Sequence, residues 1–370
     1  MKETKILVNY IGRTGGGAIF SYEMTKGLIE NGAIVTAIIP EGISNLDNWK
    51  KLSFHKLFII ETYCDKKTFI TGTLKFVFYK QWKLRNEIKH DVFDFCYIPM
   101  IQPWTFLINR LVKGIKIVAT LHDPIPHSGS HKIIEYFTVN KWVAAKADKL
   151  IILTAKFLNE VCSIYKKTPE QVKVVPHGIF DYSQYDNGQI IKRDYKYNFL
   201  FFGRIEKYKG IQILLQAYYK LKNENDDISL FIVGKGNMEE YKSLISVCQD
   251  ITVVNRFVDD DEVVSYFRGN NIITVLPYID ATQSGVVPIA MKEESLIIAT
   301  NTGGLAEQTG NGKYALLCEP SIDSVYQTMK YAITHYSECK NIIHAAKKYA
   351  DSLSWRALAK KVIEFGGSEN

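Results

Sequence analysis

Short apolar runs alternate with helical patterns along most of the chain. The first run, 6–10, leads into a glycine-rich loop and then into a helical pattern that ends at Gly32. Further apolar runs predict strands at 33–39, 95–98, 115–119, 150–153 and 172–175. Parallel strands need long crossovers, which helices usually provide. The alternation therefore predicts a parallel sheet with helices on both faces.

A polar stretch at 181–196, rich in Tyr, Asp and Asn, interrupts this pattern, and we interpret it as a linker. Beyond it, strands are predicted at 197–202, 229–233, 251–254, 272–276 and 296–299, and helical segments at 321–336, from about 337, and at 355–365. A chain of 370 residues suits two domains, which we place at 1–180 and 197–354.

The composition is that of a globular protein, with 46% hydrophobic and 23% charged residues. No apolar run approaches the ~20 residues that span a bilayer, and the polar start leads directly into a strand, so we expect no signal peptide. Six scattered cysteines without a CxxC pair argue against a zinc site and favour a reducing cytoplasm. The net charge of +7 suits nucleic acid, a membrane surface or a phosphorylated small molecule, without choosing among them.

Ligands of doubly wound sheets bind beyond the carboxyl ends of the strands, so the loops after the strands hold the candidate residues. Gly15, Gly16 and Gly17 follow the first strand and open a helix, where backbone N–H groups favour an anion. Their spacing differs from the dinucleotide fingerprint. A tight turn without a ligand is the alternative interpretation.

Two cations, Arg204 and Lys209, follow the first strand of the second half, in a loop that could clamp a diphosphate or could simply be solvated. A later loop, 277–286, leads into a helix that we expect to begin near Gln283. The unpaired N–H groups of Ser284, Gly285 and Val286 would then form a second anion site.

Two further loops carry chemistry. Glu307, in a loop that begins at Gly303, could accept hydrogen bonds from ribose hydroxyls or stabilise a helix start. His122 belongs to a stiff loop, 121–127, with a second histidine, an acid and two prolines. This density of polar groups fits a functional role as well as a structural one.

Taken in order, these motifs resemble the retaining GT-B glycosyltransferases of family 4. The matching pieces are the first glycine loop, the His-Asp loop, Val-Pro-His-Gly at 175–178, Gly203-Arg204 with Lys209-Gly210, Val-Gly-Lys-Gly at 233–236, Ser284-Gly285-Val286 and Gly303-Gly304-Leu305-x-Glu307. The resemblance covers the whole chain. It implies an α/β GT-B fold: two Rossmann-like, doubly wound domains that face a cleft, with a C-terminal helix, about 355–370, crossing back to the first domain.

The resemblance also implies roles for the site residues. Arg204 and Lys209 match the basic pair that holds the donor diphosphate and stabilises the leaving group, and His122 matches a histidine that lines the sugar site. These three are the predicted catalytic residues. The predicted donor-binding residues are Gly16, Gly17, Gly203, Gly234, Phe257, Asp280, Gln283, Ser284, Gly285, Val286 and Glu307. A nucleoside diphosphate sugar is the co-substrate, and no metal or other cofactor is implied.

The chain departs from the family pattern at one place. The family usually carries two glutamates eight positions apart; Asp280 could stand for the first, but the second falls on Pro288 or Ile289. Counting back from Met291 instead moves the first glutamate onto Ala281. Either Glu307 supplies the ribose contact, or the donor is held differently.

The triplet Asp259-Asp260-Asp261 precedes a helical run, where acids cap a helix and favour its dipole. We interpret it as structural rather than as the metal-binding DxD motif of the other glycosyltransferase fold.

A basic and aromatic stretch, 66–90, is suited to lie on anionic lipid. The alternative is a core-facing helix with a charged outer face.

The sequence predicts an enzyme that moves a hexosyl-type sugar, with retention, onto a glycan or polyprenyl-linked acceptor in bacterial surface polysaccharide synthesis. We expect it in the cytoplasm, at the inner face of the membrane, with no nucleic acid partner. The alternative is a non-catalytic GT-B protein that binds a nucleotide sugar or partners an active transferase. An NAD-dependent oxidoreductase is excluded because neither glycine loop has the required spacing.

Overall fold

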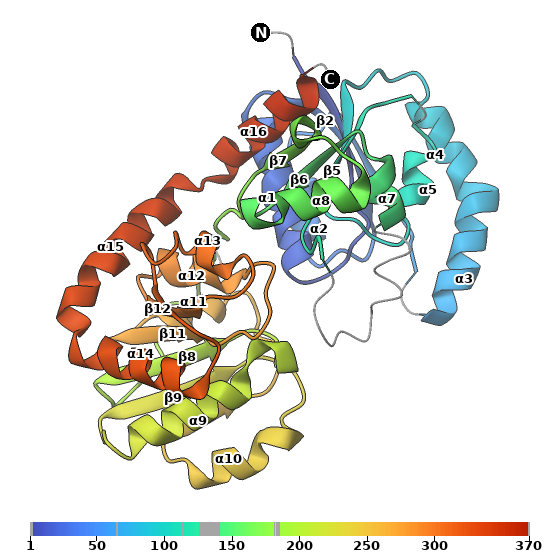
Figure 1. Cartoon of the computed structure of the whole chain (residues 1–370). Helices are drawn as coiled ribbons and strands as arrows, with labels where there is room; N and C mark the ends of the chain where they lie inside the picture. The colour runs from blue at the N-terminus through green and yellow to red at the C-terminus, as the bar shows by residue number, and fades with distance from the viewer. Residues whose placement is uncertain are drawn as a thin grey trace. The chain divides into compact units, whose positions relative to one another are not determined.

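The computed structural model describes residues 3–63, 66–112, 114–125, 141–180, 182 and 186–368. The chain divides into two compact units (Figure 1). The first unit contains the described residues up to Gly178 together with the C-terminal segment that begins at Ser354, and the second contains Ile179–Leu353.

The described part of the first unit is built on a sheet of seven parallel strands in the order β3-β2-β1-β4-β5-β6-β7. The strands are β1 (Lys5–Asn9), β2 (Ile34–Pro40), β3 (Lys56–Ile60), β4 (Phe95–Ile98), β5 (Ile117–Leu121), β6 (Lys149–Ile152) and β7 (Val172–Val174). Ile6 pairs with Val35 on one side and with Phe95 on the other. Almost every residue of β1 and β4 is buried, as expected for parallel strands that helices cover on both faces.

The helices of the first unit follow its strands. They are α1 (Gly16–Glu30), α2 (Leu46–Lys50), α3 (Lys66–Lys75), the π-helical turn η1 (Phe76–Lys80), α4 (Gln81–Ile88), α5 (Thr105–Asn109), α7 (Lys141–Lys146), α8 (Leu158–Tyr165) and α16 (Trp355–Gly367), with short 3-10 turns η3 (Ala155–Phe157) and η4 (Pro169–Gln171).

The last helix, α16, packs along α1 (Figure 1). Asn31, the residue that ends α1, donates a hydrogen bond from Nδ2 to the carbonyl oxygen of Arg356 at 2.7 Å. At the other end of α16, the buried ammonium of Lys149 donates to the carbonyl oxygen of Phe365 (3.1 Å) and to the hydroxyl of Ser368 (2.8 Å). A cation here satisfies carbonyl groups that the helix leaves unpaired at its C-terminus. The C-terminal segment is therefore an integral part of the first unit.

The second unit repeats this architecture with six parallel strands among its described residues, in the order β10-β9-β8-β11-β12-β13. They are β8 (Tyr197–Phe202), β9 (Ile228–Val233), β10 (Ile251–Val254), β11 (Ile272–Leu276), β12 (Leu296–Thr300) and β13 (Leu316–Cys318). The helices are α9 (Ile211–Lys222), α10 (Lys242–Val247), α11 (Val263–Phe267), α12 (Val286–Lys292), α13 (Leu305–Gln308), α14 (Ile322–Thr334) and α15 (Tyr336–Ser352), with 3-10 turns η6 (Lys207–Lys209) and η7 (Glu239–Tyr241).

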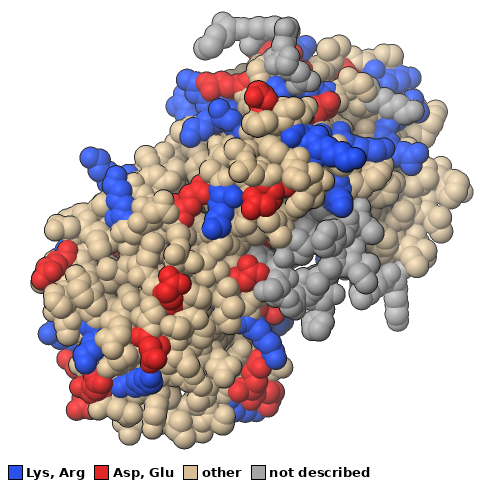
Figure 2. Space-filling view, in the orientation of Figure 1, with Lys and Arg blue, Asp and Glu red and all other residues tan. Residues whose placement is uncertain are grey.

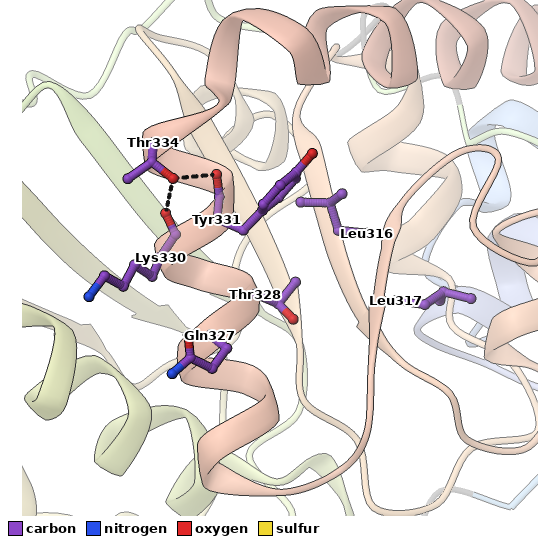
Figure 3. Close-up of a pocket in the computed structure, with 7 residues that line it drawn as sticks. All are labelled: Leu316, Leu317, Gln327, Thr328, Lys330, Tyr331 and Thr334. Carbon is purple, nitrogen blue, oxygen red and sulfur yellow. Dashed lines mark hydrogen bonds between the residues drawn. The ribbon is translucent and has the colours of Figure 1, made fainter.

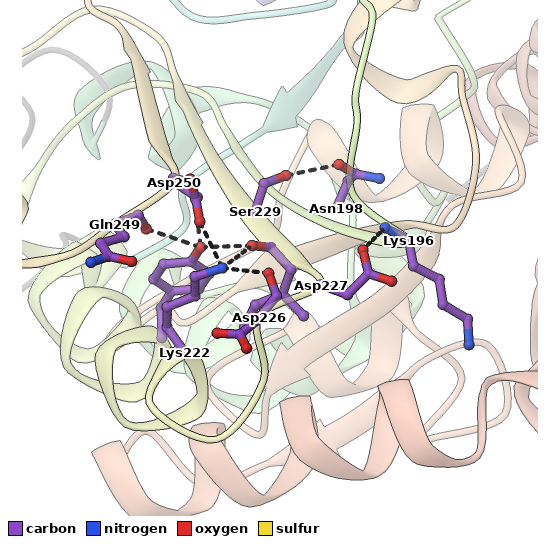
Figure 4. Close-up of polar contacts among 10 residues, drawn as sticks. Lys196, Asn198, Lys222, Asp226, Asp227, Ser229, Gln249 and Asp250 are labelled. Carbon is purple, nitrogen blue, oxygen red and sulfur yellow. Dashed lines mark hydrogen bonds and ion pairs between the residues drawn. The ribbon is translucent and has the colours of Figure 1, made fainter.

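A polar network lies at the amino ends of β9 and β10 (Figure 4). The ammonium of Lys222, whose side chain is only 8% exposed, lies 2.6 Å from the carboxylate of Asp250 and donates to the carbonyl oxygens of Asp226 (2.6 Å) and Ile228 (3.1 Å). Tyr218 donates from its hydroxyl to the carbonyl oxygen of Ile228 as well, at 3.2 Å. A buried cation with three acceptors joins α9 to two strand starts, which makes this network structural.

The predicted fold class is confirmed. The ranges 95–98, 197–202, 251–254 and 272–276 coincide with β4, β8, β10 and β11. Two strands were missed, β3 and β13, although each contains a short apolar run, at 57–60 and at 315–318. Runs this short do not distinguish a strand from a buried helical turn.

The segment predicted as a linker has neither helix nor strand over 186–196. It is part of the second unit, where Arg193 donates to the carbonyl oxygens of Tyr266 (2.6 Å) and Arg268 (2.8 Å). Residues 181 and 183–185 of this segment lie outside the described residues.

Candidate functional site

The loops that follow β8 and β11 lie side by side where the strand order of the second sheet reverses. β8 and β11 pair with each other, and their other neighbours, β9 and β12, lie on opposite sides. Ligands of such sheets bind beyond the carboxyl ends of the strands at this reversal. Gly210 ends the β8 loop with φ 69°, and a Cβ on it would lie 1.9 Å from the carbonyl oxygen of Pro277. Only glycine allows the two loops to approach this closely.

Both predicted cations lie in the β8 loop. Arg204 is exposed and donates from Nη2 to the hydroxyl of Tyr208 at 3.3 Å. The ammonium nitrogen of Lys209 lies 3.6 Å from the centroid of the Tyr278 ring, which belongs to the β11 loop. This distance is within the range of a cation–π interaction. The structure thus brings the two cations to one loop at the reversal point, where an anion would meet positive charge.

Tyr278 is fully buried beneath Lys209, and burial raises the pKa of its phenol to about 12. The phenol therefore stays neutral at physiological pH. Its hydroxyl pairs with the hydroxyl of Ser284 at 3.0 Å, so the ring is fixed at its polar end as well as by packing.

The helix after the β11 loop begins later than predicted. Its first residue is Val286, with Gly285 at the N-cap position, rather than a residue near Gln283. Two of the three N–H groups expected to be unpaired are occupied: that of Ser284 donates to Oε1 of Gln308 at 2.8 Å, and that of Val286 to the Ser284 hydroxyl at 3.3 Å. Among the described residues, only Gly285 of these three shows no partner for its N–H. The prediction of three unpaired N–H groups is therefore wrong, because Gln308 reaches in from α13.

The β11 loop and the start of α13 carry three more predicted donor-binding residues. Asp280 and Glu307 are half-buried, and the two segments are joined by a hydrogen bond of 3.0 Å from the Gly304 N–H to the carbonyl oxygen of Ala281. The side-chain oxygen of Gln283 is buried and has no hydrogen-bond partner in the described part of the chain. An unpaired buried acceptor is costly. Among these three residues, Gln283 therefore has the strongest reason to accept a hydrogen bond from a ligand.

Gly203 and Gly234 extend the strand pairing past the ends of β8 and β9. The N–H of Gly203 donates to Val233, and that of Gly234 to Val254, both at 2.9 Å. Phe257, three residues beyond β10, is 61% exposed. It offers a flat apolar ring at the same end of the sheet.

The aspartate triplet 259–261 does not occupy the capping position predicted for it. Glu262 is the N-cap residue of α11, and its carboxylate forms two hydrogen bonds of 2.6 Å with Arg256 rather than capping the helix. No group of three His, Cys, Asp or Glu side chains within the described ranges could hold a metal ion.

A second set of predicted residues lies at the strand-order reversal of the first sheet, between β1 and β4. Gly16 and Gly17 form the first turn of α1, and Gly15 precedes them with φ 75°. A Cβ on Gly17 would lie 2.5 Å from Sδ of Met100, just after β4. A larger residue at 17 would have to displace the flexible end of the Met100 side chain, so the glycine keeps this helix start closely packed on the segment after β4.

His122 follows β5 and lies in an aromatic cluster. Its Nε2 is 3.0 Å from the carbonyl oxygen of Pro99, and its ring meets Phe20 edge-on with centroids 4.4 Å apart. Phe20 also contacts His177 and Trp355, at 5.5 and 5.2 Å. Sequence reasoning named neither Phe20 nor Trp355 as site residues. The rest of the His122 loop, from residue 126 on, lies outside the described residues.

Desolvation lowers the pKa of both histidines in this cluster. The pKa of His122 falls below its ordinary value, and that of His177 falls to about 4. Both imidazoles are therefore neutral at physiological pH, and His122 presents a polar but uncharged ring.

The stretch 66–90 folds as α3, η1 and α4, with Phe76, Leu84 and Ile88 buried. The exposed apolar side chains of its outer face, which we call the α3–α4 patch, are Ile70, Leu74, Val77, Phe78, Tyr79 and Trp82. Exposed charged residues, among them Lys75, Lys83 and Arg85, lie in the same stretch. Uncharged surface predominates over these helices on the side visible in Figure 2. One side of the stretch therefore faces the core, as the alternative interpretation expected, while its outer face carries apolar and charged side chains together. Contact of this face with lipid stays a prediction. No helix in the described ranges is long and apolar enough to cross a bilayer.

A cavity of about 550 Å³ lies between α14 and β13 (Figure 3). Its lining includes Leu316, Leu317 and Tyr331, and it contains none of the predicted site residues. Lys330, which also lines it, forms an ion pair of 2.8 Å with Glu224. This cavity therefore does not belong to the candidate site.

Two family models match the chain, one in each half. The model described as Glycosyltransferase Family 4 matches residues 14–180, and the model described as Glycosyl transferases group 1 matches residues 186–349. Together they cover both units.

Curated relatives are similar over part of their length. An uncharacterized glycosyltransferase of Methanocaldococcus jannaschii is 26% identical over 234 residues, which is 58% of each chain. A D-inositol 3-phosphate glycosyltransferase of Arthrobacter is 27% identical over 234 residues, covering 59% of this chain and 55% of that protein. A lipopolysaccharide 1,2-N-acetylglucosaminetransferase of Salmonella typhimurium is 27% identical over 178 residues, covering 45% and 46%. The chain thus spans about half the length of the curated relatives it matches.

Solved structures are similar over nearly the whole chain. A glycosyltransferase from Rickettsia africae superimposes with a TM-score of 0.71 at 18% identity, covering 99% of this chain and 98% of that one. An Anabaena protein in complex with UDP-glucose gives 0.70 at 15% identity, covering 98% and 99%. At these identities the likeness establishes the fold alone.

Proposed function

This chain belongs to the group 1 glycosyltransferases of family 4, and we propose that it transfers a sugar from a nucleoside diphosphate sugar to a glycan or lipid-linked acceptor, with retention of anomeric configuration. The observation that carries the proposal is the position of Arg204 and Lys209 in one loop at the β8/β11 reversal.

The two cations act on the leaving group. When the bond between sugar and phosphate breaks, negative charge develops on the departing nucleoside diphosphate. Arg204 and Lys209 stabilise that charge more in the transition state than in the ground state, which is what accelerates the step. The stabilising charge is supplied by side chains, so the proposed chemistry needs no metal.

The remaining donor contacts follow from the same loops. The N–H of Gly285 donates to a phosphate oxygen, and Gln283 accepts from a hydroxyl of the sugar. Asp280 and Glu307 accept from ribose or sugar hydroxyls, and the exposed ring of Phe257 stacks on the nucleobase. Gly203 and Gly234 keep the backbone close enough for these contacts. Gly16 and Gly17 are assigned to the transferred sugar and the phosphates on the family resemblance.

His122 lines the sugar site as a neutral imidazole. Its ring hydrogen-bonds without adding a charge that would compete with the cationic clamp. Since no carboxylate is assigned as a nucleophile, retention would proceed by attack of the acceptor on the same face from which the diphosphate leaves.

The relatives suggest where to look for substrates. The Salmonella relative is named for transfer of N-acetylglucosamine to lipopolysaccharide, and the Anabaena structure was solved with UDP-glucose. UDP-hexoses are therefore the first donors to test, and bacterial surface polysaccharide is the first setting to consider for the product.

The α3–α4 patch supports a lipid-linked acceptor at the inner face of the membrane. Aromatic and aliphatic side chains on it would enter the interfacial region of a bilayer, and Lys75, Lys80, Lys83 and Arg85 would attract anionic lipid. Lys75 and Lys80 both pair with Glu61, which lowers the pKa of that carboxyl and offsets part of the positive charge. The apolar residues would therefore contribute most of the binding.

A non-catalytic relative that only binds a nucleotide sugar is the second candidate. It is favoured by the position of the missing glutamate, because Pro288 and Ile289 are both buried in α12 and cannot reach a ligand. Catalytic turnover separates the two proposals.

The test begins with thermal unfolding in the presence of UDP, GDP, ADP, CDP and dTDP. A nucleotide at one hundred times its Kd adds about 2.7 kcal/mol to the free energy of unfolding. The corresponding nucleotide sugars are then supplied with candidate acceptors, with and without EDTA. We expect one nucleotide to stabilise the protein and its sugar to be transferred whether or not EDTA is present. Transfer that vanishes with EDTA and returns with manganese would refute the metal-independent mechanism, and binding without any transfer would favour the non-catalytic candidate.

A further inference from the structure

Lys209 lies at one end of a chain of contacts that no family motif describes. Its ammonium nitrogen is 3.6 Å from the centroid of the Tyr278 ring. The Tyr278 hydroxyl is 3.0 Å from the Ser284 hydroxyl, and the ring is fully buried. A flexible four-carbon side chain is thus held against a rigid aromatic face.

Gln308 holds the other end of this chain. Its Oε1 accepts from the Ser284 N–H at 2.8 Å, and its Nε2 donates to the Ser284 carbonyl oxygen, also at 2.8 Å. Only a carboxamide carries both a donor and an acceptor at these two positions. A glutamate of the same size could accept from the N–H, but it would place a negative oxygen against the carbonyl.

The backbone on both sides of Lys209 is joined to the β11 loop as well. The carbonyl oxygen of Tyr208 accepts from the N–H groups of Ile279 (2.8 Å) and Asp280 (3.4 Å). On the other side, Gly210 packs directly on the carbonyl of Pro277. These contacts fix the backbone of the loop. The contact with Tyr278 then determines where the Lys209 side chain lies.

We infer that Tyr278 and Gln308 are positioning residues for the cationic clamp. Tyr278 holds the ammonium of Lys209 at the place where the diphosphate binds, and Gln308, through Ser284, fixes the loop that carries Tyr278. The role of the clamp rests on the proposed function, but the position of the Lys209 side chain can be measured without any substrate.

The placement is measured by NMR on protein whose lysines carry ¹³C-methyl groups, a modification that keeps their charge. Methyl groups above an aromatic face resonate upfield through its ring current, and the Lys209 signal is assigned by its absence in Lys209→Arg. We expect an upfield signal in the wild type and in Tyr278→Phe, which keeps the ring. In Tyr278→Leu the signal should move most of the way to the ordinary lysine position, since only the Tyr208 ring, 5.2 Å from the ammonium nitrogen, remains nearby. In Gln308→Glu it should move partly toward that position. Gln327→Glu, on α14, is the matched control and should change nothing.

Kinetics supply the second readout, with the donor that the nucleotide screen identifies. Tyr278→Leu and Gln308→Glu should lower kcat about tenfold and leave the KM for the acceptor unchanged, whereas Tyr278→Phe should lose less than Tyr278→Leu. A wild-type Lys209 signal at the ordinary lysine position would overturn the inference, as would a Tyr278→Leu variant with unchanged signal and kcat. An upfield signal in a protein that transfers no sugar would instead refute the proposed function and leave the placement of Lys209 standing.

Discussion

Three basic side chains of the β8 loop differ in what surrounds them. Arg204 is exposed and donates to Tyr208, Lys209 lies over a buried ring, and Lys207 pairs with Glu240 at 3.1 Å. Only the first two are assigned to the diphosphate. Lys207 therefore serves as an internal control, since it has the same charge, lies in the same loop, and is already paired with an acid.

Arg204→Ala and Lys209→Ala should each lower turnover about a hundredfold or more, because each removes charge that acts on the leaving group. Their thermal unfolding should stay close to that of the wild type, since neither side chain lies in the core. Lys207→Ala should retain wild-type turnover. Steady-state kinetics on the three variants check this, and full activity in both of the first two would refute the clamp.

Asp250 should give the second unit an acid-sensitive contribution to stability. Hydrogen bonds from Lys222 and Tyr195 hold the pKa of its carboxyl below the ordinary value. A carboxyl whose pKa is lower in the folded state stabilises the fold above its unfolded pKa, and this stability is lost as pH falls through the folded pKa. Asp250→Asn should remove that pH dependence and lower the free energy of unfolding at pH 7 by about 1–3 kcal/mol.

Urea unfolding at pH 7 and at pH 3 measures this effect. Asparagine is a suitable replacement because Asp250 has φ 58°, a conformation that asparagine tolerates. Equal acid sensitivity in Asp250→Asn and the wild type would assign the pH dependence to other carboxyls.

Single residues also show where prediction from sequence fails. The sequence predicted that Ser284 would offer its N–H to a ligand, whereas Gln308, twenty-four positions further along the chain, occupies it. Hydrogen bonds of this kind depend on which loops meet in three dimensions, and local sequence patterns contain no information about that. The loop positions of Arg204 and Lys209 could be predicted because they depend only on the strand that precedes them.

At the scale of elements, the α3–α4 patch is the feature most open to direct test. The central segment, η1, is a π-helical turn whose extra residue lets Phe76 face inward while Phe78 and Tyr79 face outward. The basic and aromatic composition was visible in the sequence. The sequence did not show which aromatic side chains are exposed, because the helical period changes at η1.

The patch should bind vesicles that contain anionic lipid, reversibly and with sensitivity to salt. Replacing Phe78, Tyr79 and Trp82 with Ser should abolish flotation with such vesicles at low salt, since these side chains are 71%, 78% and 72% exposed and would supply the apolar contact. Replacing Lys75, Lys80, Lys83 and Arg85 with Ser should weaken flotation less, because Glu61 already offsets part of their charge. No flotation with either kind of vesicle would refute lipid binding by the patch, and equal flotation with anionic and neutral vesicles would refute a contribution from its basic residues.

At the scale of the whole molecule, the six described strands of the second unit follow the same order as the first six of the first unit. The sequence predicted the class of both units from alternation alone. What it could not provide was the number of strands, because apolar runs as short as those of β3 and β13 fit a strand or a buried helical turn equally well. The order of the strands was also beyond local patterns, since it depends on pairing between segments far apart in the chain.

The packing of α16 on α1 has a consequence for synthesis on the ribosome. The first unit begins at the N-terminus, but the helix that covers α1 is translated only after the entire second unit. Until then the nascent chain carries an uncovered surface on α1 that includes Phe20 and Gly27, both of which lie against Trp355 in the folded protein. The second unit, by contrast, is one uninterrupted stretch from Ile179 to Leu353 and can complete its core first. The unit made first would therefore be the last to finish folding, and the emergence of α16 from the ribosome would control when it does.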